Sequence, residues 1–200
     1  YTRDRRPIRV GNTPEVLPGP ADTYMSYDLP WANASNTPFR LYKHWVHEGG
    51  IATPLVVSWP AAAAPGSVCH QPVHVVDILA TCLDAAAAAY PAEHAGRAVT
   101  PAEGESFLPA VRGEPWQRHK PLFWEHEGNR AVREGPWKLV SRHPGRWELY
   151  NMDLGRTELN DLAEKDPARV RRMAQAYDRW AETHDVVPWP PPRPRGGPRE

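Results

Sequence analysis

The sequence predicts an α/β fold that ends in a small four-stranded antiparallel sheet covered by one helix. Two observations carry this prediction. A β-branched apolar run at residues 51–59 is followed, after a Pro- and Gly-rich crossing, by an amphipathic helical pattern at 74–89, which is the combination an α/β layer requires. Further along, four short strand-like runs between residues 121 and 150 are separated by turn signals, and a second helical pattern follows at 167–183.

The composition fits a folded domain and argues against several function classes. The 200 residues include 24 basic and 24 acidic side chains, so the net charge is zero with histidine neutral. This balance argues against a polybasic surface for nucleic acids or membranes. Hydrophobic residues make up 40% of the chain, which is enough for a packed core. No run approaches the roughly 18–20 apolar residues that span a bilayer. We therefore expect neither a nucleic-acid partner nor a membrane partner.

The first half of the chain is expected to alternate irregular segments with single elements. Residues 7–30 hold five Pro and two Gly and predict an irregular surface segment. Residues 39–46 are expected to be extended, Gly49-Gly50 to turn the chain, and residues 51–59 to form a buried strand with Pro54 near an edge or bulge. Residues 90–119 are again loop-like. In the helix at 74–89, one apolar face is expected to pack inward: Val75, Ile78, Leu79, Cys82, Leu83 and Ala86.

The second half predicts a meander followed by a helix. The runs PLFWEH, NRAVR, PWKLVS and RWELY are strand-like. Turn signals separate them at Glu127-Gly128, Glu134-Gly135 and His143-Pro144-Gly145. Asp166-Pro167 is an N-cap followed by proline at the first helical position. The helix that follows is expected to cover one sheet face with an apolar stripe of Val170, Met173, Tyr177 and Trp180.

These patterns also predict how the chain is divided. Residues 1–115 are expected to be the last part of a large α/β domain, and residues 116–187 a small antiparallel sheet with its helix. Residues 188–200 are expected to be a Pro-rich disordered tail. Because the chain opens on a polar segment without an initiator Met, we expect it to begin inside a longer protein.

Polar side chains gather just before the Gly-Gly turn. Lys43, His44, His47 and Glu48 fall within six residues, and Lys43 is one of only four lysines in the sequence. Charged groups beside glycines, which let the backbone approach closely, favour an anion pocket. A solvated loop with no special role remains the alternative interpretation.

A second polar group and the two cysteines carry weaker signals. Glu125, His126, Glu127 and Asn129 are metal-ligand types close together in sequence. We expect a structural hairpin with no metal there, because neighbouring strand residues point to opposite faces and Glu127 lies in a turn. Cys69 and Cys82 are expected to be buried thiols, and a 69–82 bridge is the alternative.

Five segments, in order, resemble the sulfatase family. They are NTPFRLYKHWVHEGGIATPLVVSWP, HVVDILATCLDAA, GESFLPAVRG, FWEHEGNRAVREGPWKLV and WELYNMDLGRTELNDLA. The resemblance covers residues from about 31 to 185 and implies the C-terminal part of an alkaline-phosphatase-like sulfatase fold. The last two segments are similar to the C-terminal subdomain of arylsulfatases. The implied activity is hydrolysis of sulfate esters, with a small-molecule sulfate ester as substrate.

The resemblance also implies site residues and cofactors. Lys43 matches the family's lysine five residues before Glu-Gly-Gly, which contacts the substrate sulfate; His47 is carried over as its neighbour. The family's nucleophile is a formylglycine made from Cys or Ser in a C/S-x-P-x-R motif, and Ca²⁺ is held by aspartates and an asparagine. This sequence contains no C/S-x-P-x-R, no Asp-Asp pair and no Asp-Asn dipeptide. Formylglycine and Ca²⁺ are therefore expected only in a full-length member, and this chain alone is expected to be inactive.

Two other functions remain open at this point. Related hydrolases of phosphate or phosphonate esters share the layout of a cation and a nucleophile. The chain could also be a non-catalytic remnant that binds an anion or a partner without turnover. A further expected partner is the N-terminal part of the same protein.

Overall fold

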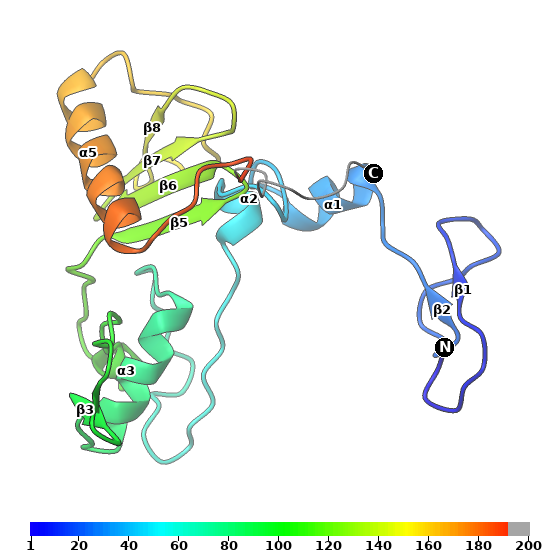
Figure 1. The fold of residues 1–200 in the computed structure, drawn as a ribbon, viewed down its shortest axis with the longest axis horizontal. Helices are drawn as coiled ribbons and strands as arrows, with labels where there is room; N and C mark the ends of the chain where they lie inside the picture. Colours follow the sequence, from blue (N-terminus) through cyan, green and yellow to red (C-terminus); the bar gives the residue numbers. More distant parts are fainter. Residues whose placement is uncertain (192–200) are drawn as a thin grey trace.

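The computed structural model describes residues 1–191. Figure 1 shows an N-terminal arm, a part built around α3, and a sheet with α5 against it. The arm contains the parallel pair β1 (Arg9–Val10) and β2 (Thr23–Tyr24), then α1 (Leu29–Asn36), and α2 (Glu48–Ile51) lies against the sheet. The next part contains α3 (Val75–Ala85), the hairpin β3 (Glu93–His94) and β4 (Arg97–Ala98), and α4 (Leu108–Val111). No helix of the described residues is long and apolar enough to cross a membrane.

The four-stranded sheet confirms the predicted meander. Its strands are β5 (Leu122–His126), β6 (Asn129–Glu134), β7 (Trp137–Ser141) and β8 (Glu148–Asn151), paired antiparallel in chain order. The first turn holds Glu127 and Gly128 at φ 51° and 81°. Positive φ at both central residues matches the twist of the flanking strands, which is why Gly follows Glu here.

The two faces of the sheet have different coverings. Val132 pairs with Leu139, which pairs with Leu149, and this row faces α5. Ala131 and Val140 pair on the opposite face. Figure 1 shows α5 on one side of the sheet and α2 on the other. Both faces are therefore buried, and the sheet is the centre of the core.

The helix α5 (Pro167–Thr183) has the predicted bounds and cap. Asp166 accepts a hydrogen bond from the backbone N–H of Arg169 at 3.0 Å, and Pro167 is the first helical residue. Trp180 stacks on Phe123 with ring centroids 5.2 Å apart. The predicted stripe is confirmed, because all four of its members pack in the cluster on this sheet face: Val170, Met173, Tyr177 and Trp180.

Two predicted extended segments are wrong. Residues 39–46 form a loop, because Leu41 and His44 take φ of 65° and 97° and fold the chain back on itself. Residues 52–59 contain no strand, and Val56 is 87% exposed. In the part of the chain that the structure describes, no strand pairs with this segment. An apolar β-branched run becomes a strand only where a neighbouring strand supplies hydrogen bonds.

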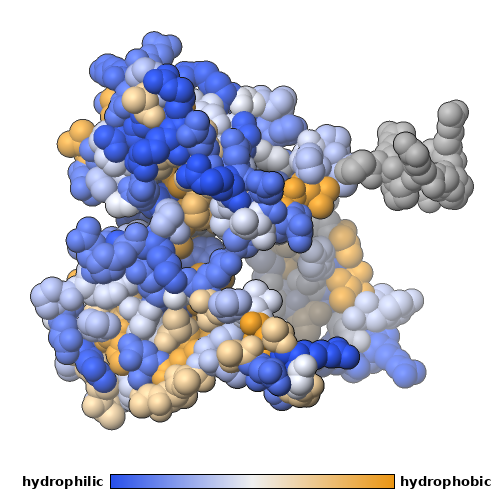
Figure 2. Space-filling model, turned by 60° about the vertical axis from the view of Figure 1, so that its left-hand side comes forward, coloured by the Kyte–Doolittle hydropathy of each residue, from blue (hydrophilic) through white to orange (hydrophobic). Residues whose placement is uncertain are grey.

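The helix predicted at 74–89 forms as α3 but ends at Ala85, and its predicted inward face is wrong. Val75, Ile78, Leu79 and Cys82 are exposed, whereas Asp77 and Thr81 are buried. Asp77 pairs with Arg118 and accepts the backbone N–H of Glu105 at 2.8 Å. The polar side of α3 thus packs against neighbouring residues of the described chain, and its apolar side is exposed to solvent. Figure 2 shows hydrophobic residues at the surface in the lower half of the molecule, the half that holds α3 in Figure 1.

The two cysteines lie at the surface, contrary to the prediction. Cys69 and Cys82 are free and exposed. The prediction of buried thiols and the alternative of a 69–82 bridge are therefore both wrong. Cys82 lies on the exposed apolar side of α3. The division between residues 115 and 116 stays a prediction. Of the predicted tail, residues 192–200 lie outside the described residues.

Candidate functional site

Lys43 lies in the loop of residues 37–47 that joins α1 to α2, which we call the Lys43 loop. Its side chain is exposed, and among residues 1–191 it forms neither an ion pair nor a side-chain hydrogen bond. Leu41 and His44, on either side of it, have positive φ. Such backbone conformations persist for non-glycine residues only where the surrounding structure holds them.

The Glu-Gly-Gly sequence is explained by how closely the Lys43 loop folds over α2. The N–H of Gly49 donates to the carbonyl oxygen of Arg40 at 3.0 Å. A Cβ atom on Gly49 would overlap the carbonyl oxygens of Arg40 and Leu41, and one on Gly50 would overlap that of Trp45. Both glycines are therefore required by close backbone approach.

A set of four charged side chains, three buried and one exposed, joins α2 to the sheet, and we call it the ion cluster. It consists of Glu48, Lys138, Arg156 and Glu158. Lys138 on β7 is 0% exposed, and its Nζ lies 3.0 Å from Oε1 of Glu48 and 2.8 Å from Oε1 of Glu158. Glu158 also accepts the backbone N–H of Glu48 at 2.9 Å. The two carboxylates thus neutralise the buried ammonium and orient the first turn of α2.

Arg156 completes the balance of charge in the ion cluster. It donates to Oε2 of Glu48 from Nη2 at 2.9 Å and from Nε at 3.2 Å. Burial opposes ionisation of Glu48, but the charges and hydrogen bonds of Lys138 and Arg156 outweigh it and lower the pKa of this carboxyl. The two buried carboxylates are therefore balanced by buried Lys138 and by Arg156, whose side chain is 51% exposed.

His47 and Glu148 form a second buried contact. His47 is 1% exposed, and its Nε2 lies 3.5 Å from Oε2 of Glu148, at the long limit of a hydrogen bond. Neither ring nitrogen has a closer partner among the described residues. Glu148 also accepts from Tyr150 Oη at 2.6 Å and from Arg40 at 3.2 Å. The His47 contact, then Tyr150 and Arg40, hold the pKa of Glu148 at about 2 against the effect of burial.

Apolar contacts fix the rest of the Lys43 loop. Val46 is buried in the cluster of the second sheet face, with Ala131 and Val140. The guanidinium of Arg142 lies over the ring of Trp45, 4.4 Å from its centroid. The loop is thus held just after Lys43, while the Lys43 side chain remains exposed.

Of Lys43, predicted to contact the sulfate, and His47, predicted as its neighbour in the site, only Lys43 is exposed. His47 is packed against the sheet, which makes it a positioning residue of the loop in this structure. The catalytic roles of both stay predictions. Sequence reasoning missed Lys138 as the anchor. A signal was available, since adjacent apolar pairs such as Leu139-Val140 and Ala131-Val132 indicate a sheet buried on both faces, where a lysine at position 138 must be buried too.

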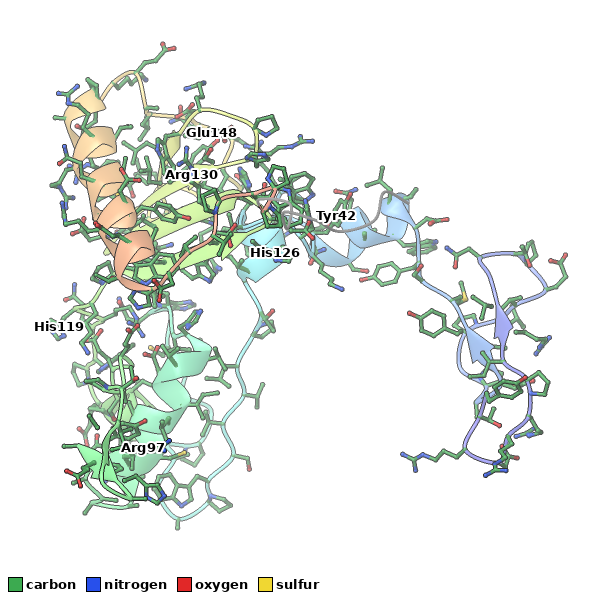
Figure 3. The ribbon with its side chains drawn as sticks, viewed as in Figure 1. Tyr42, Arg97, His119, His126, Arg130 and Glu148 are labelled. Atoms are coloured by element: carbon green, nitrogen blue, oxygen red, sulfur yellow. The ribbon has the colours of Figure 1, made fainter. Side chains whose placement is uncertain are left out.

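A second polar cluster lies beside the Lys43 loop. Nδ1 of His44 is 2.7 Å from Oε2 of Glu127, and the rings of His44 and His126 have centroids 5.5 Å apart. Figure 3 places His126 near α2 and Tyr42. In residues 1–191 these three side chains are the only group of at least three His, Cys, Asp or Glu spaced to hold a metal ion.

The described residues do not fit the cofactors that the resemblance implies. Ca²⁺ takes six to eight oxygen ligands, roughly, in proteins, whereas two of the three groups in this cluster are imidazoles. Neither cysteine stands in a C/S-x-P-x-R sequence, so neither suits conversion to formylglycine. Both cofactors stay predictions for a longer family member.

Comparison with known proteins shows what the chain is similar to. Residues 39–180 match the family model described as N-sulphoglucosamine sulphohydrolase, C-terminal. An uncharacterized sulfatase of Schizosaccharomyces pombe is 31% identical over 166 residues, covering 80% of this chain and 30% of the relative. A sulfatase of Formosa agariphila is 30% identical over 190 residues, covering 78% and 34%. The chain thus spans about a third of the length of these relatives.

The fold is also similar to a solved structure. The crystal structure of Ps i-CgsB superposes with a TM-score of 0.62 at 24% identity, covering 73% of this chain and 32% of that one. This similarity concerns the fold, and it confirms the predicted α/β class of the alkaline-phosphatase-like type.

Proposed function

The chain belongs to the sulfatase family, whose C-terminal portion it carries, and from this we propose that it completes an arylsulfatase-type sulfuric ester hydrolase in which Lys43 contacts the sulfate. The observation that carries this proposal is the contrast within the Lys43 loop. Glu48, Val46 and His47 are buried against the sheet, whereas Lys43 is exposed without a counter-ion in residues 1–191.

An ammonium held in this way suits a tetrahedral anion. Lysine presents a compact point charge, and a cation whose backbone is already in place needs less reorganisation to stabilise a developing anion. The ion cluster holds the end of the loop, so the cost of positioning the Lys43 backbone is met in folding. In this proposal, the sequence around Lys43 serves to place one ammonium.

The same proposal assigns the nucleophile and the Ca²⁺ ligands to other parts of the protein. No residue of this chain stands in the motif for the nucleophile, and the described residues do not form an oxygen-rich metal site. We therefore expect the 200-residue chain alone to be inactive on sulfate esters.

The test compares two lengths of the protein on an aryl sulfate with added Ca²⁺. One sample is the 200-residue chain; the other is extended upstream through its coding sequence and made in a host that forms formylglycine. We expect turnover only in the extended protein. There, Lys43→Ala should lower kcat/KM about 100-fold or more, whereas the matched control Lys165→Ala, at an exposed lysine, should leave it unchanged.

Other outcomes separate the alternatives. An extended protein that hydrolyses an aryl phosphate or phosphonate in preference to the sulfate would overturn the sulfatase proposal. A folded extended protein without C/S-x-P-x-R and without turnover would identify a non-catalytic remnant. Equal losses of kcat/KM in Lys43→Ala and Lys165→Ala would show that Lys43 does not contact the substrate.

A further inference from the structure

His44, His126 and Glu127 form a cluster that the proposed sulfate chemistry does not use. Each of the three offers one ligand atom, and these atoms all lie within 4.8 Å of one another. His44 and Glu127 are already in direct contact, at 2.7 Å between Nδ1 and Oε2. We propose that these three side chains bind one divalent transition metal ion, for which Zn²⁺ is the representative probe.

Tertiary structure brings the three ligands together from two elements. His44 belongs to the Lys43 loop, whereas His126 ends β5 and Glu127 begins the turn to β6. His44 and Glu127 both have positive φ, 97° and 51°, a conformation uncommon for non-glycine residues. These two bends bring the His44 and Glu127 side chains into direct contact.

The ligand set selects a class of metal. Two imidazole nitrogens and one carboxylate oxygen suit Zn²⁺ and its neighbours in the transition series, whereas Mg²⁺ and Ca²⁺ prefer oxygen ligands. Zinc sites with three protein ligands keep a further position for water or another small ligand. His126 is exposed and the other two ligands are half-buried, so solvent can reach that position.

Asn129 forms hydrogen bonds that fix the backbone beside the proposed ligands. It is 1% exposed, and its Nδ2 donates to the carbonyl oxygen of His126 at 2.9 Å. Its Oδ1 accepts the backbone N–H of His143 at 3.0 Å, which fixes the orientation of the amide. Nδ2 is 3.4 Å from Nε2 of His44, a weak contact beside the bond to His126. Binding of a metal through Nδ1 of His44 would displace the proton that this atom shares with Oε2 of Glu127.

A bound ion would join the Lys43 loop to the β5–β6 turn. In this structure the pair of His44 and Glu127, with side chains 38% and 40% exposed, makes that connection together with a 3.4 Å hydrogen bond from Nδ2 of Asn129 to the carbonyl oxygen of His44. Coordination by three side chains would replace this pair with a tighter link next to Lys43. The inference does not depend on sulfatase activity, because it concerns metal binding by residues that are all present in this chain.

The test is titration of the whole 200-residue chain with ZnCl₂ by isothermal calorimetry, after treatment with EDTA. We expect one Zn²⁺ per chain and no comparable binding of MgCl₂. His126→Ala and Glu127→Gln should each weaken the Kd by more than about tenfold, since loss of even an outer-shell partner costs roughly 10–100-fold. Zn²⁺ should also raise the Tm of the unmodified chain by mass action.

His119→Ala is the matched control. His119 is exposed, and its Nδ1 lies 3.4 Å from Oε1 of Glu105, which is the kind of surface pair that takes up metal adventitiously. This variant should bind Zn²⁺ as the unmodified chain does. An unchanged Kd in both His126→Ala and Glu127→Gln, or an equal loss in the control, would overturn the proposal. Circular dichroism in EDTA checks the fold of each variant. Because no sulfate ester is present, the outcome is separate from that of the sulfatase assay.

Discussion

Nζ of Lys138 and Oε1 of Glu48 lie 3.0 Å apart in the interior, although the two residues are separated by 90 positions in the sequence. This contact joins the second residue of β7 to the first residue of α2. Because α2 continues directly from the Lys43 loop, the position of Lys43 depends on the C-terminal sheet. Several consequences of this arrangement can be measured.

The first prediction concerns the ammonium of the ion cluster. Lys138→Met would leave Glu48 and Glu158 facing each other without the buried cation, and breaking such a set typically costs about 3–5 kcal/mol. We expect the free energy of unfolding in urea to fall by that amount at an unchanged m-value. Lys165→Met, at an exposed lysine, should change it by less than about 0.5 kcal/mol. Similar values for the two variants would contradict the role given to Lys138.

The second prediction concerns the glycines of α2. Gly49→Ala would place a Cβ against two backbone carbonyl oxygens of the Lys43 loop, which cannot move as a side chain can. We expect a loss of about 2–3 kcal/mol in the free energy of unfolding. Gly155→Ala is the control, because no atom lies within 4 Å of its added Cβ. Its thermal melting curve should match that of the unmodified chain. A Gly49→Ala variant with the same melting curve as Gly155→Ala would show that the loop is not packed as described.

The third prediction is a pH dependence carried by Glu148. Its pKa in the folded chain is about 2, lowered from 4.5 chiefly by the His47 contact. A lowered carboxyl pKa contributes stability that is present above pH 4.5 and is lost as the pH falls toward 2. Glu148→Gln should reduce stability at pH 7 and flatten its decline over that interval, as measured by urea midpoints at several pH values.

Glu182→Gln provides the comparison for that experiment, because Glu182 is exposed near the end of α5. Its stability profile should retain the slope of the unmodified chain. Some slope should also remain in Glu148→Gln, since hydrogen bonds and nearby cations lower the pKa of Glu134 and Asp166 as well. Identical slopes in Glu148→Gln and the unmodified chain would refute the assignment to Glu148.

The fourth prediction concerns the exposed apolar surface. Val56 is 87% exposed within residues 52–59, and Ile78 and Leu79 are exposed on α3. Exposed large apolar side chains of this kind promote association. We expect the chain to self-associate as its concentration rises, as seen by light scattering after size exclusion. Val56→Lys should reduce that association without lowering the Tm, whereas a concentration-independent monomer would contradict the prediction.

Local sequence was sufficient for β5–β8 and α5. Each strand pairs with its neighbour in the chain, the turns carry their own signals, and Asp166-Pro167 starts the helix. Elements of this kind depend on contacts between segments close in sequence, so the residue composition and the hydrophobic periodicity of each segment predict them. The same reasoning failed for residues 51–59 and for the inward face of α3. There, apolar periodicity indicates a surface that can be buried, but burial requires a partner that the pattern does not contain.

The sequence by itself determined which segments form the C-terminal sheet and its helix, and through its resemblance to the sulfatases it marked Lys43. Only the tertiary structure decided how the backbone around Lys43 is held. The ion pair between Glu48 and the buried Lys138 anchors α2, and the backbone of the Lys43 loop packs closely against Gly49. The tertiary structure also brought His44 to His126 and Glu127. The reason is physical, because secondary structure follows from interactions within a few residues, whereas ion pairs and metal-ligand groups depend on distances between side chains far apart in the chain.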